Sequence, residues 1–225
     1  QTLVRDNTIT NNARGVLVGA PVGQTDAVYP QQTRIVNNSI SGNGIPAGGP
    51  FPVDASLLGR GIVLNPETNP GGLTTNPNND IDPPASLRMS ATGVLSGTIN
   101  PAAGAGNCAP VGQTTCLIQV FRPNQTTRDG QGQEFAGQTS AAANGSFAVN
   151  VGAIPRQLTL TATDPVSNTS RFVVFTPTPS LSISAPQSRT ADPGEQITYT
   201  HTVQNNGNLE LANVQLTVTT SRGWQ

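Results

Sequence analysis

The sequence predicts an all-β protein that consists of the end of a parallel β-helix, then an immunoglobulin-like β-sandwich, then a partial β-sandwich. Three observations predict this order. The N-terminal part contains an internal repeat, and after a linker rich in Pro and Asn the pattern changes to short strands of alternating apolar residues. Helices are disfavoured throughout, because 24 Gly and 19 Pro are spread over 225 residues and both residue types destabilise helix interiors.

The repeat comprises two coils within the first 64 residues. One segment, Asn7-Thr-Ile-Thr-Asn-Asn12, recurs 31 residues later as Asn38-Ser-Ile-Ser-Gly-Asn43. Another, Arg14-Gly-Val-Leu-Val18, recurs 46 residues later as Arg60-Gly-Ile-Val-Leu64, so the second coil carries an insertion of 15 residues at about 44–58. This pattern is typical of a parallel β-helix, in which apolar side chains point inward and Asn side chains stack at the bends.

We expect three domains: residues 1–84 with the coils and a Pro- and Asn-rich linker, residues 85–178 as an immunoglobulin-like sandwich, and residues 179–225 as an incomplete sandwich. The middle domain has seven short alternating runs with turn residues between them. The expected strands are Ala85–Met89, Gly93–Ile99, Cys116–Arg122, Gln133–Thr139, Gly145–Val151, Gln157–Asp164 and Thr169–Thr176, followed in the last domain by 181–184, 196–203 and 213–218. We expect Asp129 and Glu134, which flank Gly130-Gln-Gly132, to lie in an exposed hairpin.

Three segments resemble parts of large secreted bacterial surface proteins. Residues 1–64 resemble right-handed parallel β-helix repeats. The segment 162–172 is similar to the closing motif of the immunoglobulin-like domains that often follow such helices, with Ser167 in place of the usual Gly and Arg171 in place of the usual acidic residue. The segment 193–208 resembles repeated surface domains with a Pro-Gly-Glu…Thr-Tyr…Asn-x-Gly-Asn pattern. The resemblance implies an extracellular, cell-surface protein and specifies architecture better than activity.

The two cysteines, Cys108 and Cys116, close a short loop between two expected strands. We expect a local disulfide, with free thiols as the alternative, and a disulfide would place the chain in an oxidising compartment. Two cysteines and one distant histidine are too few for a structural zinc site. We therefore expect no zinc and no cofactor, and we assign no metal ligands to Cys or His.

The charge pattern argues against a nucleic-acid partner, and the apolar pattern argues against a membrane-spanning helix. The chain has a net charge of −1, and its 11 basic residues are all Arg and are scattered singly, whereas nucleic-acid binding needs clustered Lys and Arg. No apolar run approaches the roughly 20 residues of a membrane-spanning helix. We expect neither a nucleic-acid partner nor a membrane-spanning segment.

The acidic residues do not form a catalytic pair. The acids of the first region, Asp6, Asp26, Asp54 and Glu67, do not align on neighbouring coils by the repeat, and the counterpart of Asp6 is Asn37. His201 lacks a partner for a nucleophilic relay, so it is interpreted as a residue on the face of a sheet. We expect the protein not to be an enzyme. A calcium site at Asp80 and Asp82 stays open beside the simpler interpretation of a solvated turn.

These observations predict a non-catalytic structural module of a cell-surface protein, a filament or sheath subunit that assembles by strand complementation. The alternative is a glycan-binding or polysaccharide-degrading fragment of a β-helix protein. The expected partners are the chain itself or flanking domains, and a cell-surface glycan under the alternative.

A stack needs about three coils, so we expect Gln1 to lie inside a larger stack unless subunits complete one another. The expected assembly edge comprises Thr2, Val4, Ile197, Tyr199, Val214, Leu216, Val218 and Trp224. The candidate glycan contacts are Tyr29 and Phe51, whose alternative role is to pack an insertion onto the coil.

Overall fold

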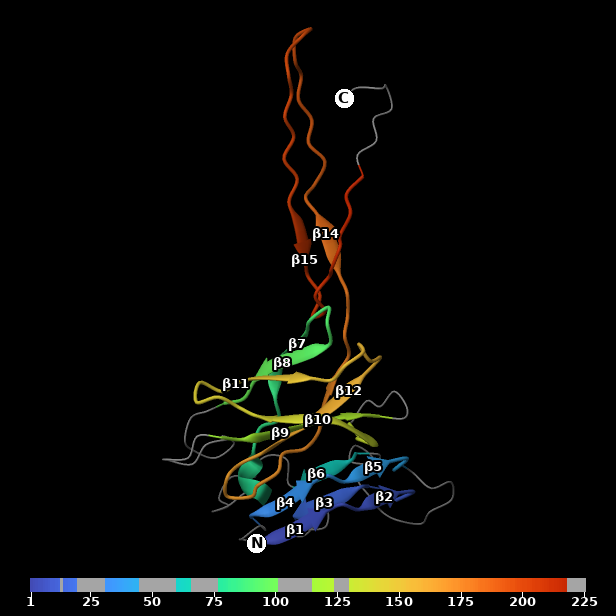
Figure 1. Cartoon of the computed structure of the whole chain (residues 1–225), viewed down its shortest axis with the longest axis vertical. Helices are drawn as coiled ribbons and strands as arrows, with labels where there is room; N and C mark the ends of the chain where they lie inside the picture. The colour runs from blue at the N-terminus through green and yellow to red at the C-terminus, as the bar shows by residue number, and fades with distance from the viewer. Residues whose placement is uncertain are drawn as a thin grey trace.

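The computed structural model describes residues 1–12, 14–19, 31–44, 60–65, 77–100, 115–123 and 130–217. Within these ranges the protein is all-β, as predicted, and its helical content is one short 3-10 helix, η2 (Pro77–Asp80). Figure 1 shows an elongated molecule in which short parallel strands lie at the N-terminal end, two sheets follow, and a thin arm projects from the opposite end. The N-terminal strands, the pair of sheets and the C-terminal arm therefore lie along the molecule in the order of the chain.

The N-terminal strands form two stacked turns. The first turn contains β1 (Thr2–Arg5), β2 (Thr8–Thr10) and β3 (Val16–Gly19), and the second contains β4 (Thr33–Val36), β5 (Ser39–Ser41) and β6 (Ile62–Asn65). Each strand of the first turn pairs in parallel with its counterpart, β1 with β4, β2 with β5 and β3 with β6. Because Ile9 lies opposite Ile40 and Val16 opposite Ile62, the repeat in the sequence is also the repeat in space.

Asparagine side chains join the two turns at their bends. The backbone N and the Nδ2 of Asn7 donate to Asn38 Oδ1 at 3.0 and 3.1 Å. Asn12 donates in the same way to Asn43 Oδ1, at 3.0 and 3.4 Å. The bonds from the backbone N of Asn7 and of Asn12 replace main-chain partners that the backbone loses where it turns a corner.

The middle of the molecule consists of two antiparallel sheets. One has the order β11-β8-β7, from β7 (Ala85–Met89), β8 (Val94–Thr98) and β11 (Ser146–Asn150). The other has the order β10-β9-β12-β13, from β9 (Leu117–Arg122), β10 (Glu134–Ser140), β12 (Leu158–Thr163) and β13 (Val173–Phe175). Both sheets contribute to one core, in which Leu95, Ile118, Val120, Leu158 and Leu160 are fully buried.

Each of the seven strands expected between residues 85 and 178 is present, and the last is much shorter than predicted. It was expected over Thr169–Thr176 and covers only Val173–Phe175. The segment before it keeps only an isolated bridge to β12, between Thr169 and Thr163, because Thr169 donates its N–H to Thr33 O in the second turn, at 3.3 Å. Phe172 likewise packs against the second turn rather than into the core between the sheets.

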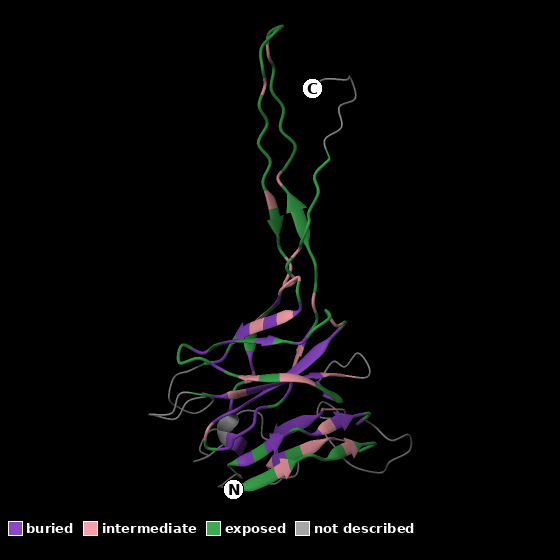
Figure 2. Ribbon diagram, viewed as in Figure 1, coloured by how far each residue is buried: buried purple, intermediate pink, exposed green. Residues whose placement is uncertain are grey.

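The C-terminal arm is a ribbon with little regular pairing. Its strands are β14 (Leu181–Ile183) and β15 (Val203–Asn205), which pair antiparallel. The expected strands over 196–203 and 213–218 were wrong for the described residues, except at Val203. Side chains interrupt the ladder, since Thr202 N donates to Ser184 Oγ and Gln187 Nε2 donates to Thr200 O. The arm is exposed along its length (Figure 2).

The base of the arm is fixed to the edge of β7. Met89 N donates to Asn208 O, and Glu210 N donates to Met89 O, both at 2.8 Å. Asn208 also bridges back to the preceding linker, because its Oδ1 accepts from Thr178 N at 2.6 Å and its Nδ2 donates to Thr176 O at 3.0 Å. Leu209 packs against the core of the two sheets. The arm therefore leaves the molecule from a defined point.

Candidate functional site

The two stacked turns differ sharply in burial although they share one sequence motif. Asn38, Ile40 and Asn43 of the second turn are 3%, 1% and 6% exposed. At the same positions of the first turn, Asn7 and Asn12 are exposed and Ile9 is half-buried (Figure 2). The difference arises because the four-stranded sheet and its loops cover the second turn, whereas no described residue covers the outer side of the first.

Two phenylalanines form the apolar part of the cover. Phe121 of β9 and Phe172 pack with residues of both turns in a second hydrophobic cluster, separate from the core between the sheets. Their rings meet edge to face, with centroids 5.7 Å apart and planes at 83°, which is a favourable aromatic geometry. The cluster contains Val18, Ile35, Ile40, Ile62, Leu64, Phe121 and Phe172.

Gln131 continues the asparagine ladder beyond the second turn. Its Oε1 accepts from the backbone N and from the Nδ2 of Asn43, at 2.9 and 3.1 Å. These are the two bonds that Asn43 Oδ1 accepts from Asn12. The Nε2 of Gln131 also donates to Asn43 O at 2.9 Å. Gln131 thus occupies the place that an Asn of a third turn would have.

Asn78 seals the edge of β4. Its Oδ1 accepts from Thr33 N at 2.9 Å, and its Nδ2 donates to Thr33 O at 2.8 Å and to Thr169 O at 3.0 Å. Thr169 Oγ1 accepts from the next outward amide, Ile35 N, at 2.9 Å. An unpaired strand edge is a template for another strand, and here side chains satisfy that edge instead.

Gln119 and two glycine carbonyls complete the cover. Gln119, in the middle of β9, accepts from Asn37 N at 3.2 Å and is fully buried. The carbonyls of Gly130 and Gly132 accept from Gly61 N at 3.0 Å and from Ile40 N at 2.7 Å. A Cβ on Gly132 would lie 2.7 Å from the side chain of Phe121, so this close approach requires glycine. We call the covering set of Asn78, Gln119, Gln131, Thr169 and these two carbonyls the amide cap.

The amide cap corrects one prediction and refines another. Glu134 is exposed, as expected, and Asp129 lies outside the described residues. The Gly130-Gln-Gly132 run between them is buried, with Gln131 only 6% exposed, because it bonds to the second turn. The segment expected to be a linker contacts both neighbouring parts over its last residues. Asn78 joins the second turn there, and Ile81 is buried in the core of the sheets. The sequence signal that could have predicted this contact is a Gln between two Gly, after an expected strand.

Several candidate residues lie outside the described residues: Tyr29, Phe51, Cys108, Val218 and Trp224, and the acids Asp26, Asp54 and Glu67. Cys116 is buried in the core between the sheets, and its disulfide with Cys108 stays a prediction. Thr2 and Val4 belong to β1 on the outer turn, whereas Ile197, Tyr199, Val214 and Leu216 belong to the C-terminal segment. The structure therefore does not bring the two halves of the expected assembly edge together.

The polar residues considered for chemistry are dispersed. Asp6 forms an exposed ion pair with Arg5, at 2.9 Å. His201 lies on the arm, with its Nδ1 3.2 Å from Ser184 Oγ. Among the described residues, no three His, Cys, Asp or Glu side chains gather where a metal ion could bind.

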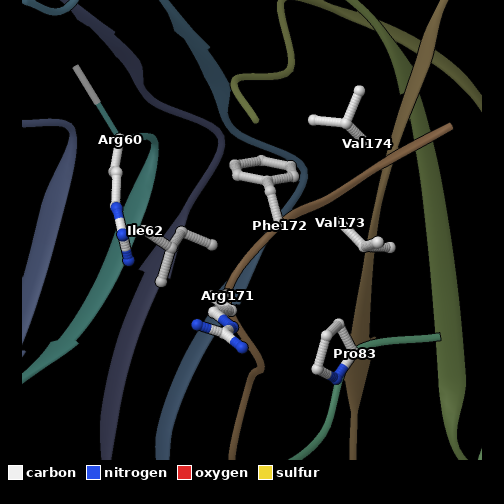
Figure 3. A pocket seen from close by; sticks show the side chains of 7 residues that line it. All are labelled: Arg60, Ile62, Pro83, Arg171, Phe172, Val173 and Val174. Atoms are coloured by element: carbon white, nitrogen blue, oxygen red, sulfur yellow. The ribbon is translucent and has the colours of Figure 1, made fainter. Parts of the chain in front are cut away.

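A cavity of about 340 Å³ lies where the second turn meets β13 (Figure 3). Arg60 and Arg171 lie on one side of it and Phe172 beside them, with Ile62 between the two arginines in this view. Two guanidinium groups next to an aromatic ring would suit an anionic ligand. Both arginines already have interactions within the protein, so the cavity by itself defines no ligand.

Comparison of the sequence with protein-family models and with curated proteins gives no match. In the part of the chain that the structure describes, no helix has the length and apolar character needed to cross a bilayer. The function is therefore argued from the capped and uncovered sides of the two stacked turns.

Proposed function

We propose that the protein is a non-catalytic, extracellular structural module of a cell-surface protein. In this proposal residues 1–65 are the last turns of a right-handed parallel β-helix, the two sheets form an immunoglobulin-like domain that ends it, and the C-terminal arm mediates assembly. One observation carries the proposal: side-chain amides at 78, 119 and 131 satisfy the outward edge of the second turn.

The amide cap supports a structural role because it gives the stack a direction. A solenoid end exposes unpaired N–H and C=O groups and needs a cap to remain soluble. The cap closes one side, while the strand edges of the first turn stay uncovered by any described residue. A module that is closed on one side and open on the other can terminate or join a rod.

The arm supports assembly through strand addition. It projects from the end of the molecule opposite the first turn (Figure 1), and it exposes the large apolar side chains of Leu181, Ile183, Tyr199, Val214 and Leu216. Exposed apolar groups on a thin ribbon gain stability when another strand or sheet covers them. We propose that flanking domains or other copies of the chain supply that cover, which would make the protein a filament or sheath subunit.

The cavity at Arg60 and Arg171 is the observation that favours the alternative, a glycan-binding module. Its guanidinium groups and Phe172 would suit a carboxylated sugar. A titration with oligouronates, followed by NMR of the Phe172 ring and of the arginine Nε–H groups, would detect such binding. Saturable shifts that disappear in Arg171→Ala would favour the alternative over a purely structural role.

The proposal is tested by assembly and by activity measured on the same material. The chain and the variant Ile183→Glu/Tyr199→Glu are compared by analytical ultracentrifugation and electron microscopy over a range of concentrations. The variant Thr200→Glu/Thr202→Glu, also on the arm, is the matched control for added charge. We expect assembly that the apolar-face variant loses, together with no release of reducing ends from polysaccharides. Sugar release would contradict the structural role, and a monomer at every concentration would contradict assembly through the arm.

A further inference from the structure

The outer side of the first turn is a second interaction surface, formed by the outward edges of β1 and β2 and by the side chains of Asn7 and Asn12. We infer that this face binds one further β-turn of the same repeat, stacked in parallel at the spacing of 31 residues that relates Asn7 to Asn38. The inference rests on the proposed structural function and specifies the partner at the uncovered side.

The asparagine ladder runs in one direction, and this gives the face its polarity. Each acceptor of the ladder receives, at its side-chain amide oxygen, the N–H groups of the Asn one turn earlier. Asn43 Oδ1 accepts from Asn12, and Gln131 Oε1 accepts from Asn43. The Oδ1 of Asn7 and that of Asn12 are the next acceptors in this series. Neither Oδ1 has a hydrogen-bond donor among the described residues, although both Nδ2 groups are bonded. The face thus presents two side-chain acceptors, the Oδ1 of Asn7 and that of Asn12, at the positions where the ladder Asn residues of an earlier turn would donate.

The backbone and the apolar side chains of the first turn are also prepared for a neighbour. Thr2 N donates to Gln32 O, and the parallel register then directs the amides of Leu3, Arg5, Thr8 and Thr10 away from the second turn. Val4, Ile9 and Val16 are half-buried, whereas their counterparts Ile35, Ile40 and Ile62 are buried. A partner must therefore supply carbonyls at strand spacing and apolar side chains above these three positions.

A second copy of the chain does not meet these requirements. Stacking head to tail would need the outward side of the second turn, which the amide cap occupies. Stacking head to head would pair the strands antiparallel and would oppose the Oδ1 acceptors of Asn7 and Asn12 to the same acceptors of the other copy. A parallel turn with backbone donors at the ladder positions is the partner that fits.

The experiment extends the chain by its own sequence, with residues 1–31 duplicated directly before Gln1. In this chain the added ladder residues fall 31 positions before Asn7 and Asn12, matching the spacing to the second turn. Amide hydrogen exchange at Thr8 and Thr10 should slow by at least about tenfold, because both amides gain partners. An extension of equal length made of Gly and Ser is the control and should leave both rates unchanged. An added turn that gives no protection overturns the inference.

A double-mutant comparison tests the ladder itself. The substitution Asn12→Ala is made in the original and in the extended chain. The loss in the folding equilibrium constant should be about five- to tenfold larger in the extended chain, since the bonds that Asn12 Oδ1 accepts from the added turn are also removed. Asn206→Ala on the arm is the matched control and should have equal effects in both chains. Equal effects of Asn12→Ala, or a concentration-dependent dimer of the original chain that protects Thr8 and Thr10, overturn the inference. Release of sugar from polysaccharides would instead contradict the proposed structural role, and it would leave the hydrogen-exchange results at Thr8 and Thr10 unaffected.

Discussion

Gln131 accepts from Asn43 the same two hydrogen bonds that Asn43 accepts from Asn12, although Gln131 belongs to the loop before β10 and not to the stacked turns. Its extra methylene lets the amide reach the second turn from that loop. A side chain therefore substitutes for a whole further turn at this bend. The consequences can be measured at individual residues.

Removal of the amide of Gln131 should destabilise the protein substantially. Gln131→Met keeps the length of the side chain and leaves the N–H and the C=O of buried Asn43 without partners. We expect a loss of about 2–4 kcal/mol in the free energy of unfolding, from three hydrogen bonds and the orphaned groups. Urea denaturation measures it. Gln204→Met, an exposed Gln on the arm, is the control and should change stability by less than about 0.5 kcal/mol.

The stability of the protein should depend on both the acceptor and the donor of the Asn78 side chain. Asn78→Asp retains an oxygen for Thr33 N but loses the donor to Thr33 O and Thr169 O, and it places a carboxyl group in a fully buried site. We expect a loss of at least about 2 kcal/mol. Hydrogen exchange at Thr33 should accelerate along with the loss of global stability. Unchanged stability in Asn78→Asp would mean that water reaches this site and that Asn78 does not satisfy the edge of β4.

Phe172 should contribute far more than Phe135, although both rings meet Phe121 edge to face. Their centroids lie 5.7 and 5.9 Å from that of Phe121, respectively. Phe172 is 7% exposed and Phe135 is 48% exposed. Phe172→Ala should cost about 3–5 kcal/mol, as for a buried aromatic residue, whereas Phe135→Ala should cost about 1 kcal/mol or less. Equal effects in thermal unfolding would contradict a tight contact between the turns and the sheet.

Ser167→Gly should stabilise the protein. Ser167 has φ of 77°, which L-residues other than Asn and Asp rarely adopt and which glycine adopts without steric strain. We expect a gain of about 0.5–1 kcal/mol, reduced by loss of the bond from Gln1 Nε2 to Ser167 Oγ. Ser146→Gly in β11 is the matched control and should destabilise by a similar amount. A Tm that falls in both variants would contradict this account of the turn.

The predicted disulfide between Cys108 and Cys116 can be tested directly. Peptide mapping of the unreduced protein should recover the two cysteines in one linked fragment. Reduction should lower stability by about 2–3 kcal/mol, as expected for closure of a short loop. Cys108→Ser should behave as the reduced protein does, and alkylation of both thiols in the untreated protein would contradict the prediction.

Much of the fold could be predicted because local periodicity specifies it. The 31-residue spacing of Asn7 and Asn38 fixed the pairing of β2 with β5, and the strand at Ala85–Met89 was predicted at its observed bounds. In these places the side chains pack within their own repeat or sheet. The alternation or repetition of apolar residues is therefore enough to predict the strand.

The amide cap could not be predicted in the same way. Asn78, Gln119 and Gln131 come from three separate segments, and each resembles an ordinary turn or surface residue when considered alone. Their role appears only when the sheet lies on the second turn and leaves unpaired N–H groups to satisfy. On the arm, alternation at Ile197 and Tyr199 predicted a strand, but no described neighbour supplies the second sheet that would make it regular.

Native-state hydrogen exchange on the two turns tests the central claim most directly. The amide cap predicts that Thr33, Ile35, Ile40 and Asn43, whose amides bond to the cap, exchange only with global unfolding. It also predicts that Leu3, Arg5, Thr8 and Thr10 exchange at least about a hundredfold faster in the same chain. Equal protection of the two sets, or faster exchange on the second turn, would contradict a stack that is closed on one side only.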